Sequence, residues 1–173
     1  MQTHLLIGNI FSFFSAMCIA VSVIKRSKKG FMLWQIGDTA FGIVANVALF
    51  AYAALVISII CLIRNCLSYM GKLTKKITFV LLCLSIIIGF YANNLGLIGW
   101  LPIIASASYT VCIYVTKNEQ QMRYALTFNM ALWFLHNLYV MAYPSAIANV
   151  LLLLWTIWQI VKEYQRQELT HKF

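Results

Sequence analysis

The sequence contains little charge and very few acidic residues. Of its 173 residues, 62% are hydrophobic and 10% are charged, and Asp and Glu together number 4. A soluble domain carries about 25% charged residues, so the composition excludes an ordinary water-soluble fold. The chain also lacks an HExxH motif, a glycine-rich phosphate loop and a Ser/His/Asp set, and no enzyme is predicted.

Cysteine and basic residues point to no special chemistry. The 5 cysteines all fall inside apolar runs, without a CxxC pair or a histidine at metal-ligand spacing. Neither disulfides, a metal site nor a cofactor is therefore predicted. The net charge is +9, but the basic residues occupy short segments between apolar runs, so nucleic acid is not an expected partner. The expected partner is the lipid bilayer.

Long apolar runs dominate the chain. A helix that crosses about 30 Å of hydrocarbon needs about 20 mostly apolar residues. Seven runs qualify, near residues 5–24, 31–51, 53–70, 77–93, 96–116, 122–141 and 144–162. The first run has no basic residue before it, which favours a retained helix over a signal peptide. Arg64 interrupts the third run, although an arginine near a helix end can snorkel to the headgroups.

The basic residues share one side of the predicted bundle. With seven alternating spans, the turns near residues 52–53, 93–96 and 143–144 carry no charge and lie on the opposite side. The basic side holds all 13 Lys and Arg: Lys25, Arg26, Lys28, Lys29, Arg64, Lys72, Lys75, Lys76, Lys117, Arg123, Lys162, Arg166 and Lys172. The positive-inside rule predicts that this side is cytoplasmic, with the N-terminus outside and the C-terminus in the cytoplasm.

An offset of 91 positions aligns the chain with itself. It places Leu6-Ile7-Gly8 on Leu97-Ile98-Gly99, Ser15-Ala16 on Ser106-Ala107, Asn46 on Asn137, and Ala51-Tyr52 on Ala142-Tyr143. The same offset superimposes spans one to three on spans five to seven. We therefore predict an all-α integral membrane protein with two parallel three-helix repeats, 1–70 and 96–163, a linker helix in 71–95 and a cytoplasmic tail, 164–173. The odd linker span puts the pseudo-twofold axis along the membrane normal.

This 3+1+3 plan resembles the SWEET and PQ-loop transporters of the MtN3-like group and the nicotinamide riboside transporters of the PnuC type. Within that group the closest likeness is to the bacterial inner-membrane family called YgjV. The residues that carry it are Leu101-Pro102, Met122-Arg123, Trp133 with His136-Asn137, and Ile63-Arg64. The resemblance implies an inner-membrane location and a fold before it implies an activity.

Two elements of the wider group are incomplete in this chain. Pro102 stands where PQ-loop families keep a helix-bending proline, and a proline in a membrane helix allows a hinge. Its repeat mate is Phe11, and Ile103 replaces the expected glutamine. The sugar transporters use an asparagine from span three and another from span seven; Asn149 matches the second, but Ser58 stands at the first. That departure counts against sugar as the substrate.

Asp38 is the one acidic residue inside an apolar run. An ionised carboxylate in hydrocarbon costs at least about 2.5 kcal/mol on insertion scales, so Asp38 is expected to face protein or water. Counting about 1.5 Å per residue from Phe31 places it about 10 Å from the cytoplasmic end. With its repeat mate Asn129 it forms either a proton or cation switch or an inner gate. The alternative is a structural tie to Gln35, to Lys29 or to the span-six amide.

A second polar level lies nearer the predicted outside. Its members are Asn46, Trp133, His136 and Asn137. In a shared central path the amides can bond a solute and Trp133 can stack on a ring. The alternative is interhelical hydrogen bonding, which is favoured for Asn46 and Asn137 because they occupy the same repeat position. For His136, proton coupling competes with the commoner role of a buried hydrogen-bonding side chain.

Two functions are compatible with these patterns. The first is a carrier for a small polar metabolite (a sugar, a nucleoside or a vitamin-like compound), which alternates access between the two triplets. Its candidate substrate-binding residues are Asp38, Asn46, Ser58, Asn129, Trp133, His136, Asn137 and Asn149, with Pro102 as hinge. The alternative is a non-transporting membrane module that binds a partner protein or lipid through its basic face. The substrate, the coupling ion and the formation of a homo-oligomer are left open.

Overall fold

The computed structural model describes residues 2–25, 28–115 and 119–171, which form seven α-helices and no strand. The helices are α1 (Gln2–Ile24), α2 (Lys28–Ala48), α3 (Tyr52–Tyr69), α4 (Lys75–Ala92), α5 (Trp100–Val115), α6 (Glu119–Tyr139) and α7 (Tyr143–His171). Each helix overlaps one of the seven apolar runs. The predicted all-α class is confirmed.

Local chemistry sets several helix ends. The hydroxyl of Thr74 accepts a hydrogen bond from the backbone N–H of Ile77 at 3.4 Å and caps α4, as expected of an N-cap threonine. Gly71 has a φ of 71° just after α3, which glycine adopts without strain. Pro102 is the third residue of α5, where a backbone N–H would have no intrahelical acceptor. It therefore breaks no helical hydrogen bond there, and its role as a hinge stays a prediction.

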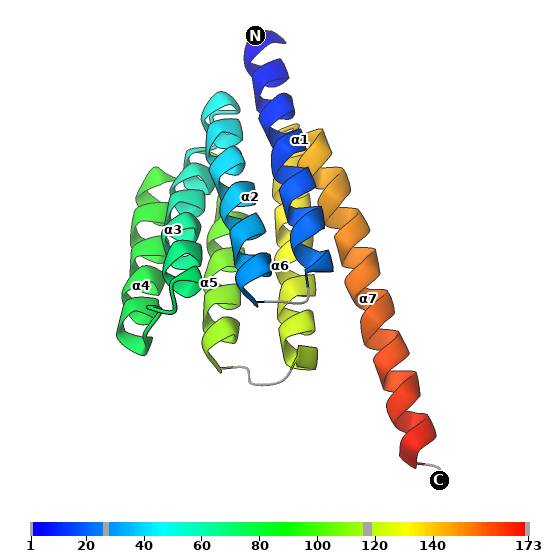
Figure 1. Cartoon of the computed structure of the whole chain (residues 1–173). Coiled ribbons are helices and arrows are strands. Elements are labelled where there is room, and N and C mark those ends of the chain that lie inside the picture. Colours follow the sequence, from blue (N-terminus) through cyan, green and yellow to red (C-terminus); the bar gives the residue numbers. More distant parts are fainter. Residues whose placement is uncertain (1, 26–27, 116–118, 172–173) are drawn as a thin grey trace.

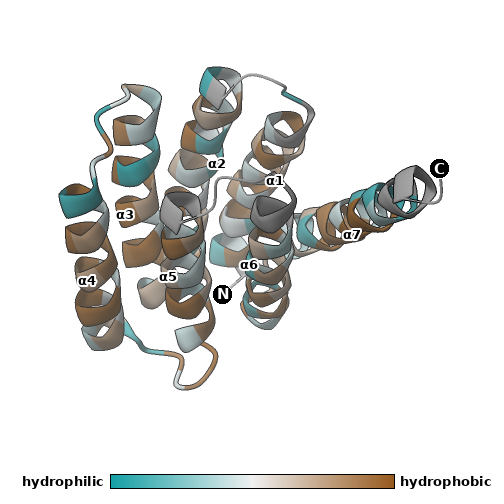
Figure 2. Ribbon diagram, turned by 90° about the horizontal axis from the view of Figure 1, so that it is seen from below, coloured by the Kyte–Doolittle hydropathy of each residue, from teal (hydrophilic) through white to brown (hydrophobic). Residues whose placement is uncertain are grey.

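Six of the seven helices form a closed ring. Neighbouring contacts join α1 to α2, α2 to α3, α3 to α5, α5 to α6, α6 to α7, and α7 back to α1. Helix α4 packs against α3 and α5 from outside this ring. The view along the bundle shows α1, α2 and α3 on one side and α5 and α6 on the other, with α4 at the edge (Figure 2). The two chain ends lie at opposite ends of the bundle (Figure 1).

The molecule is apolar outside and polar inside. Large hydrophobic side chains such as Phe13, Phe79 and Leu151 are more than half exposed on three different helices. Serine, threonine and asparagine side chains are buried on most of the helices, among them Ser12 and Asn65. Such an inverted distribution suits a hydrocarbon solvent, because a polar side chain in lipid must face the bundle interior.

Four helices are long and apolar enough to cross a membrane. These segments are Thr3–Ser22, Tyr52–Tyr69, Lys75–Ala92 and Tyr143–Gln165, and Trp100–Cys112 is apolar but shorter. The other two helices, α2 and α6, have the length but contain more polar residues, among them Asp38 and Asn129. The two long helices with the more polar sequences are therefore the middle helices of the two predicted triplets. The count of seven spans stays a prediction.

The turns after α2 and α6 share their backbone geometry at the offset of 91. Phe50 and Met141 both have positive φ, 56° and 60°, which is unusual for bulky residues. The N–H of Ala51 donates to the carbonyl of Asn46 at 3.0 Å, and that of Ala142 to Asn137 at 2.8 Å. Both helices thus end in the same Schellman motif, although neither has the glycine that usually occupies its positive-φ position.

Candidate functional site

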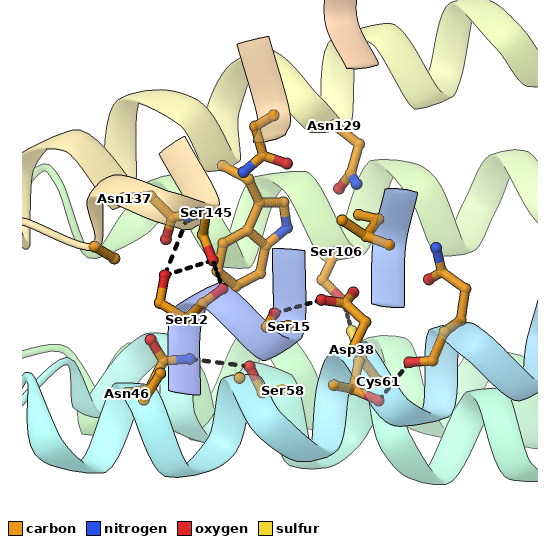
Figure 3. Close-up of a pocket in the computed structure, with 18 of the residues that line it drawn as sticks. Ser12, Ser15, Asp38, Asn46, Ser58, Cys61, Ser106, Asn129, Asn137 and Ser145 are labelled. Carbon is orange, nitrogen blue, oxygen red and sulfur yellow. Dashed lines mark hydrogen bonds between the residues drawn. The ribbon is translucent and has the colours of Figure 1, made fainter. Parts of the chain in front are cut away.

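A polar cavity lies inside the six-helix ring. Its volume is about 110 Å³, and side chains from α1, α2, α3, α5, α6 and α7 line it, but none from α4. Figure 3 shows serine, asparagine and aspartate side chains converging on it from both sides of the ring. A polar space of this size holds several water molecules, since one water needs only about 10–15 Å³ on this measure. The interior of the bundle is therefore hollow at its most polar level.

Seven of the residues predicted to bind substrate line this cavity. They are Asp38, Asn46, Ser58, Asn129, Trp133, Asn137 and Asn149. The eighth, His136, does not line it: its side chain is fully buried, and neither ring nitrogen has a hydrogen-bond partner in the described part of the chain. Trp133 packs against it edge-to-face with ring centroids 5.6 Å apart. His136 is therefore the one predicted substrate-binding residue that lies outside the cavity lining.

Asp38 lies at the middle of its helix, facing the cavity. The Ser15 hydroxyl on α1 donates to Oδ1 of Asp38 at 2.5 Å (Figure 3). Because α2 begins at Lys28 and not at Phe31, Asp38 is about 15 Å from the helix start, by 1.5 Å per residue. The predicted depth of about 10 Å was counted from Phe31, where the apolar run begins, and it stays a prediction.

The predicted ties to Gln35 and Lys29 are wrong. The side-chain amide of Gln35 donates to the Ser22 hydroxyl at 3.4 Å, and Lys29 is exposed. Nor does a hydrogen bond join Asp38 to the Asn129 amide within the described residues. The carboxylate accepts its hydrogen bond from Ser15 of α1 instead.

The second polar level of the first triplet is also paired. Asn46 on α2 donates through Nδ2 to the Ser58 hydroxyl on α3 at 3.1 Å, and both side chains are buried. Asn46 thus makes the interhelical bond that was the favoured alternative for it. In the second triplet the equivalent residues, Asn137 and Asn149, both line the cavity without a hydrogen bond between them.

Arg64 is a buried cavity residue that the sequence patterns did not predict. Its side chain is 5% exposed and lines the cavity, so the guanidinium does not snorkel to the surface. It donates to the Thr110 hydroxyl at 2.9 Å and to Oδ1 of Asn65 at 3.3 Å, and it lies 5.3 Å from the ring centroid of Tyr109. The available signal was its position inside an apolar run, more than one turn before the helix end.

Hydrogen bonds close the ring at the end that carries the α2–α3 and α6–α7 turns. The Ser12 and Ser145 side chains bond each other at 2.7 Å, joining α1 to α7. Asn9 of α1 donates to the Met141 carbonyl at 3.1 Å and accepts from the Tyr143 N–H at 3.1 Å. These contacts link α1 to the start of α7, and we call them the turn-end clasp.

A second asparagine makes the same bridge on the other turn. Asn94, in the turn between α4 and α5, donates to the Phe50 carbonyl at 2.7 Å and accepts from the Tyr52 N–H at 3.2 Å. Phe50 and Tyr52 are the partners of Met141 and Tyr143 at the offset of 91. Each turn is therefore bridged by an asparagine that lies outside its own triplet, and Asn94 is included in the turn-end clasp.

Within the described residues, no group of three or more His, Cys, Asp or Glu side chains is placed to hold a metal ion. The described cysteines are free thiols, and Cys61 lines the cavity with its sulfur 3.3 Å from the Ser106 hydroxyl. The chemistry that the cavity offers is therefore hydrogen bonding and charge.

An all-helical bundle with an apolar exterior and a hollow polar interior is a multi-pass membrane protein. The chain belongs to a family of bacterial inner membrane proteins, Imp-YgjV, whose family model matches residues 6–167. No curated protein and no solved structure matches the chain. The predicted YgjV family and the inner-membrane location are confirmed. Membership of the wider SWEET and PQ-loop group stays a prediction.

Proposed function

We propose that the chain is a carrier for a small polar solute, with the cavity inside the helix ring as its binding site. The supporting observation is that this cavity is polar, reaches Asp38 and is enclosed by helices of both predicted triplets. Ligand sites are typically enclosed spaces with a few well-placed polar groups. A dry, packed interior, the arrangement expected of a non-transporting module, would lack such a space.

The proposed mechanism is alternating access between α1–α3 and α5–α7. The matched turns at the offset of 91 support two parallel repeats of the SWEET-like kind, with α4 as the linker outside the ring. All seven helices would then cross the membrane, with the N-terminus outside. The low hydropathy of α2 and α6 follows, because both contribute side chains such as Asp38 and Asn129 to the cavity and need not be apolar there.

The turn-end clasp is the proposed outer gate. Its bonds between α1 and α7, such as that between Ser12 and Ser145, join helices of different triplets. At the other end of the bundle, α7 diverges from α1 and α6 (Figure 1). Rocking of the triplets would break the clasp and open the cavity outward. The described conformation would then be the one closed on the outside.

Cysteine accessibility tests this proposal without knowledge of the solute. A variant that retains only Cys61, in the cavity, is treated with a membrane-impermeant anionic thiosulfonate on intact cells and on inverted vesicles. We expect modification from the cytoplasmic side, and additional modification from outside after Ser12→Ala and Ser145→Ala weaken the clasp. The matched control retains only Cys83 on α4, outside the ring, and should react from neither side. A Cys61 that stays unreactive from both sides in both backgrounds would contradict the proposal.

A second candidate function is a non-transporting module that binds a partner protein or anionic lipid. The exposed side chains of Lys72, Lys75 and Lys76 around the start of α4 favour it, because clustered lysines at a membrane surface attract acidic groups. Replacement of all three lysines by Gln would abolish the binding of the partner protein or anionic lipid by such a module. In a carrier the same change should leave Cys61 modification unaltered.

A further inference from the structure

Two opposite charges line the cavity without neutralising each other. Asp38 on α2 accepts from Ser15, and Arg64 on α3 donates to Thr110 and Asn65. Both charged side chains line the same space. Within the described residues, neither forms an ion pair with the other or with any third residue. Charges left unpaired in a protein interior are costly, so this arrangement calls for an explanation.

The two charges stand at nearly the same depth. Asp38 precedes Ala48, the last residue of α2, by ten residues, and Arg64 follows Tyr52, the first residue of α3, by twelve. At 1.5 Å per residue, they lie about 15 and about 18 Å from the turn that joins the two helices. They therefore lie at a similar depth in the cavity that both side chains line.

Each charged group has unused hydrogen-bonding capacity. A guanidinium has five N–H donors, and the Arg64 bonds use one on each of its three nitrogens, which leaves two. Only Oδ1 of Asp38 has a bonding partner among the described residues, although a carboxylate accepts through both oxygens. Bidentate pairing with a carboxylate is the strongest bond that a guanidinium makes. An ammonium group is the matching partner for Asp38.

We propose that the cavity binds a small zwitterion of the α-amino acid class, with its carboxylate on Arg64 and its ammonium on Asp38. This inference rests on the proposed carrier function and names its substrate class. A simple carboxylate would leave Asp38 without a counter-charge, an amine would leave Arg64 without one, and a neutral sugar would satisfy neither. Only a molecule that carries both charges neutralises both ends.

The size of the cavity restricts the class further. Its volume is about 110 Å³, whereas a cavity of about 150 Å³ accommodates benzene. The described conformation therefore fits an amino acid with a very small side chain and is too small for a nucleoside. Tyr109 and Trp133 supply aromatic walls, and Asn129 and Asn149 bring amides to the same space.

Isosteric ligands test the assignment directly. The probes are L-alanine, isobutyrate, in which a methyl group replaces the ammonium, and 2-propylamine, which lacks the carboxylate. Binding to the purified full-length protein is measured by calorimetry. We expect L-alanine to bind at least about tenfold more tightly than either analogue, because each analogue leaves one buried charge unpaired. Equal binding of isobutyrate, or no binding of L-alanine, would overturn the proposal.

Two variants separate recognition from folding. Asp38→Asn should remove the preference for L-alanine over isobutyrate and keep the preference over 2-propylamine. Arg64→Gln should remove the preference for L-alanine over 2-propylamine and keep the preference over isobutyrate. Arg64→Lys should retain part of the preference over 2-propylamine. A merely structural role would weaken all three ligands equally, and that result would contradict the inference. Phe79→Ala, on the exposed face of α4, is the matched control and should change none of the affinities.

Flux measurements distinguish this inference from the carrier proposal. Proteoliposomes loaded with L-alanine are assayed for counterflow of labelled L-alanine. Selective binding without flux would refute the carrier and uphold the zwitterion site. Flux of a neutral polyol such as glycerol, without L-alanine binding, would refute the zwitterion site and uphold the carrier.

Discussion

The two sides of the cavity differ in how their polar residues are bonded. On the α1–α3 side, Ser15 holds Asp38 and Asn46 holds Ser58. On the α5–α7 side, the residues at the offset of 91 are Ser106, Asn129, Asn137 and Asn149, and within the described residues no hydrogen bond joins them in the same pairs. The two sides match in the backbone geometry of their turns but differ in the hydrogen bonds between their side chains. The first side is tied together internally, and the second presents amides to the cavity.

The sequence changes that separate the two sides are few. At the offset of 91, Asp38 corresponds to Asn129 and Ser58 corresponds to Asn149. A carboxylate attracts the donor of a nearby serine, which an amide does less strongly, and a serine on α3 accepts from Asn46 where a second amide makes no such bond. Unequal residues in matched positions thus pair Asn46 within the first side and leave the amides of the second side free to bond a solute that Asp38 and Arg64 hold.

The largest expected effect comes from making the two sides alike. Asn129→Asp would put a second carboxylate into the cavity, and an aspartate at the centre of a membrane helix costs about 2.5–3.5 kcal/mol on insertion scales. We expect a loss of stability of about 3 kcal/mol in thermal unfolding of the purified protein. The control Asn129→Ser should cost less than about 1 kcal/mol. An unchanged midpoint for Asn129→Asp would mean that bulk water bathes this position.

The next effect measures the bond that distinguishes Asp38. Ser15→Ala removes a hydrogen bond to a charged group, which is worth about 1.5–3 kcal/mol. Its counterpart Ser106→Ala loses only the contact of Ser106 with the Cys61 sulfur, which is weak. We expect about 2 kcal/mol for the first and under about 1 kcal/mol for the second in the same unfolding assay. Equal losses would show that the two sides are bonded alike.

A third prediction has the opposite sign. His136 is fully buried and lacks a hydrogen-bond partner in the described chain, while its counterpart Ala45 is small and apolar. His136→Phe removes an unsatisfied polar group, whose burial costs about 1–3 kcal/mol. We expect stability to rise by about 1 kcal/mol, with L-alanine binding intact. Loss of transport with binding preserved would instead assign proton coupling to His136.

The smallest effect contrasts the paired asparagine with its counterpart. Asn46→Ala breaks the bond to Ser58, and such bonds average about 0.6 kcal/mol in membrane bundles. Asn137→Ala should change stability by less than that, but should weaken L-alanine binding. Thermal unfolding measures the stability of the two variants, and calorimetry measures their affinity for L-alanine. Weakened binding in Asn46→Ala alone would reverse the roles assigned to the two sides.

Sequence patterns predicted the helices and seven of the 21 residues that line the cavity. Asp38 was found as the one acidic residue inside an apolar run, and Asn129 as its mate at the offset of 91. Asn149 was found through the resemblance to the sugar transporters. Bonding partners were not readable, because a helical stripe shows which face is polar but not which helix lies opposite. His136 was grouped with Asn129 and Trp133 by helical spacing, but its ring packs against Trp133 and does not line the cavity.

Arg64 and the turn-end clasp show two further limits. Positive-inside counting treats every arginine as a surface charge, so a buried Arg64 is invisible to it. The positive φ of Phe50 and Met141 carries no glycine signal, and tertiary context has overridden local preference. Asn9 and Asn94 stand at different positions relative to the offset, so no self-comparison could pair them. Long-range packing alone brings them to equivalent turns.

Helix α7 is longer than the hydrocarbon core of a bilayer is thick. It begins at Tyr143 and has 29 residues, which span about 43 Å against about 30 Å of hydrocarbon. A crossing that starts at Tyr143 reaches about 28 Å at Lys162, whose ammonium lies 5.1 Å from the ring centroid of Trp158. Tryptophan and lysine together mark the headgroup level. The remaining turns would then stand in water. Because α7 is part of the ring, a thinner or thicker bilayer that tilts this helix should also shift its contacts with α1 and α6.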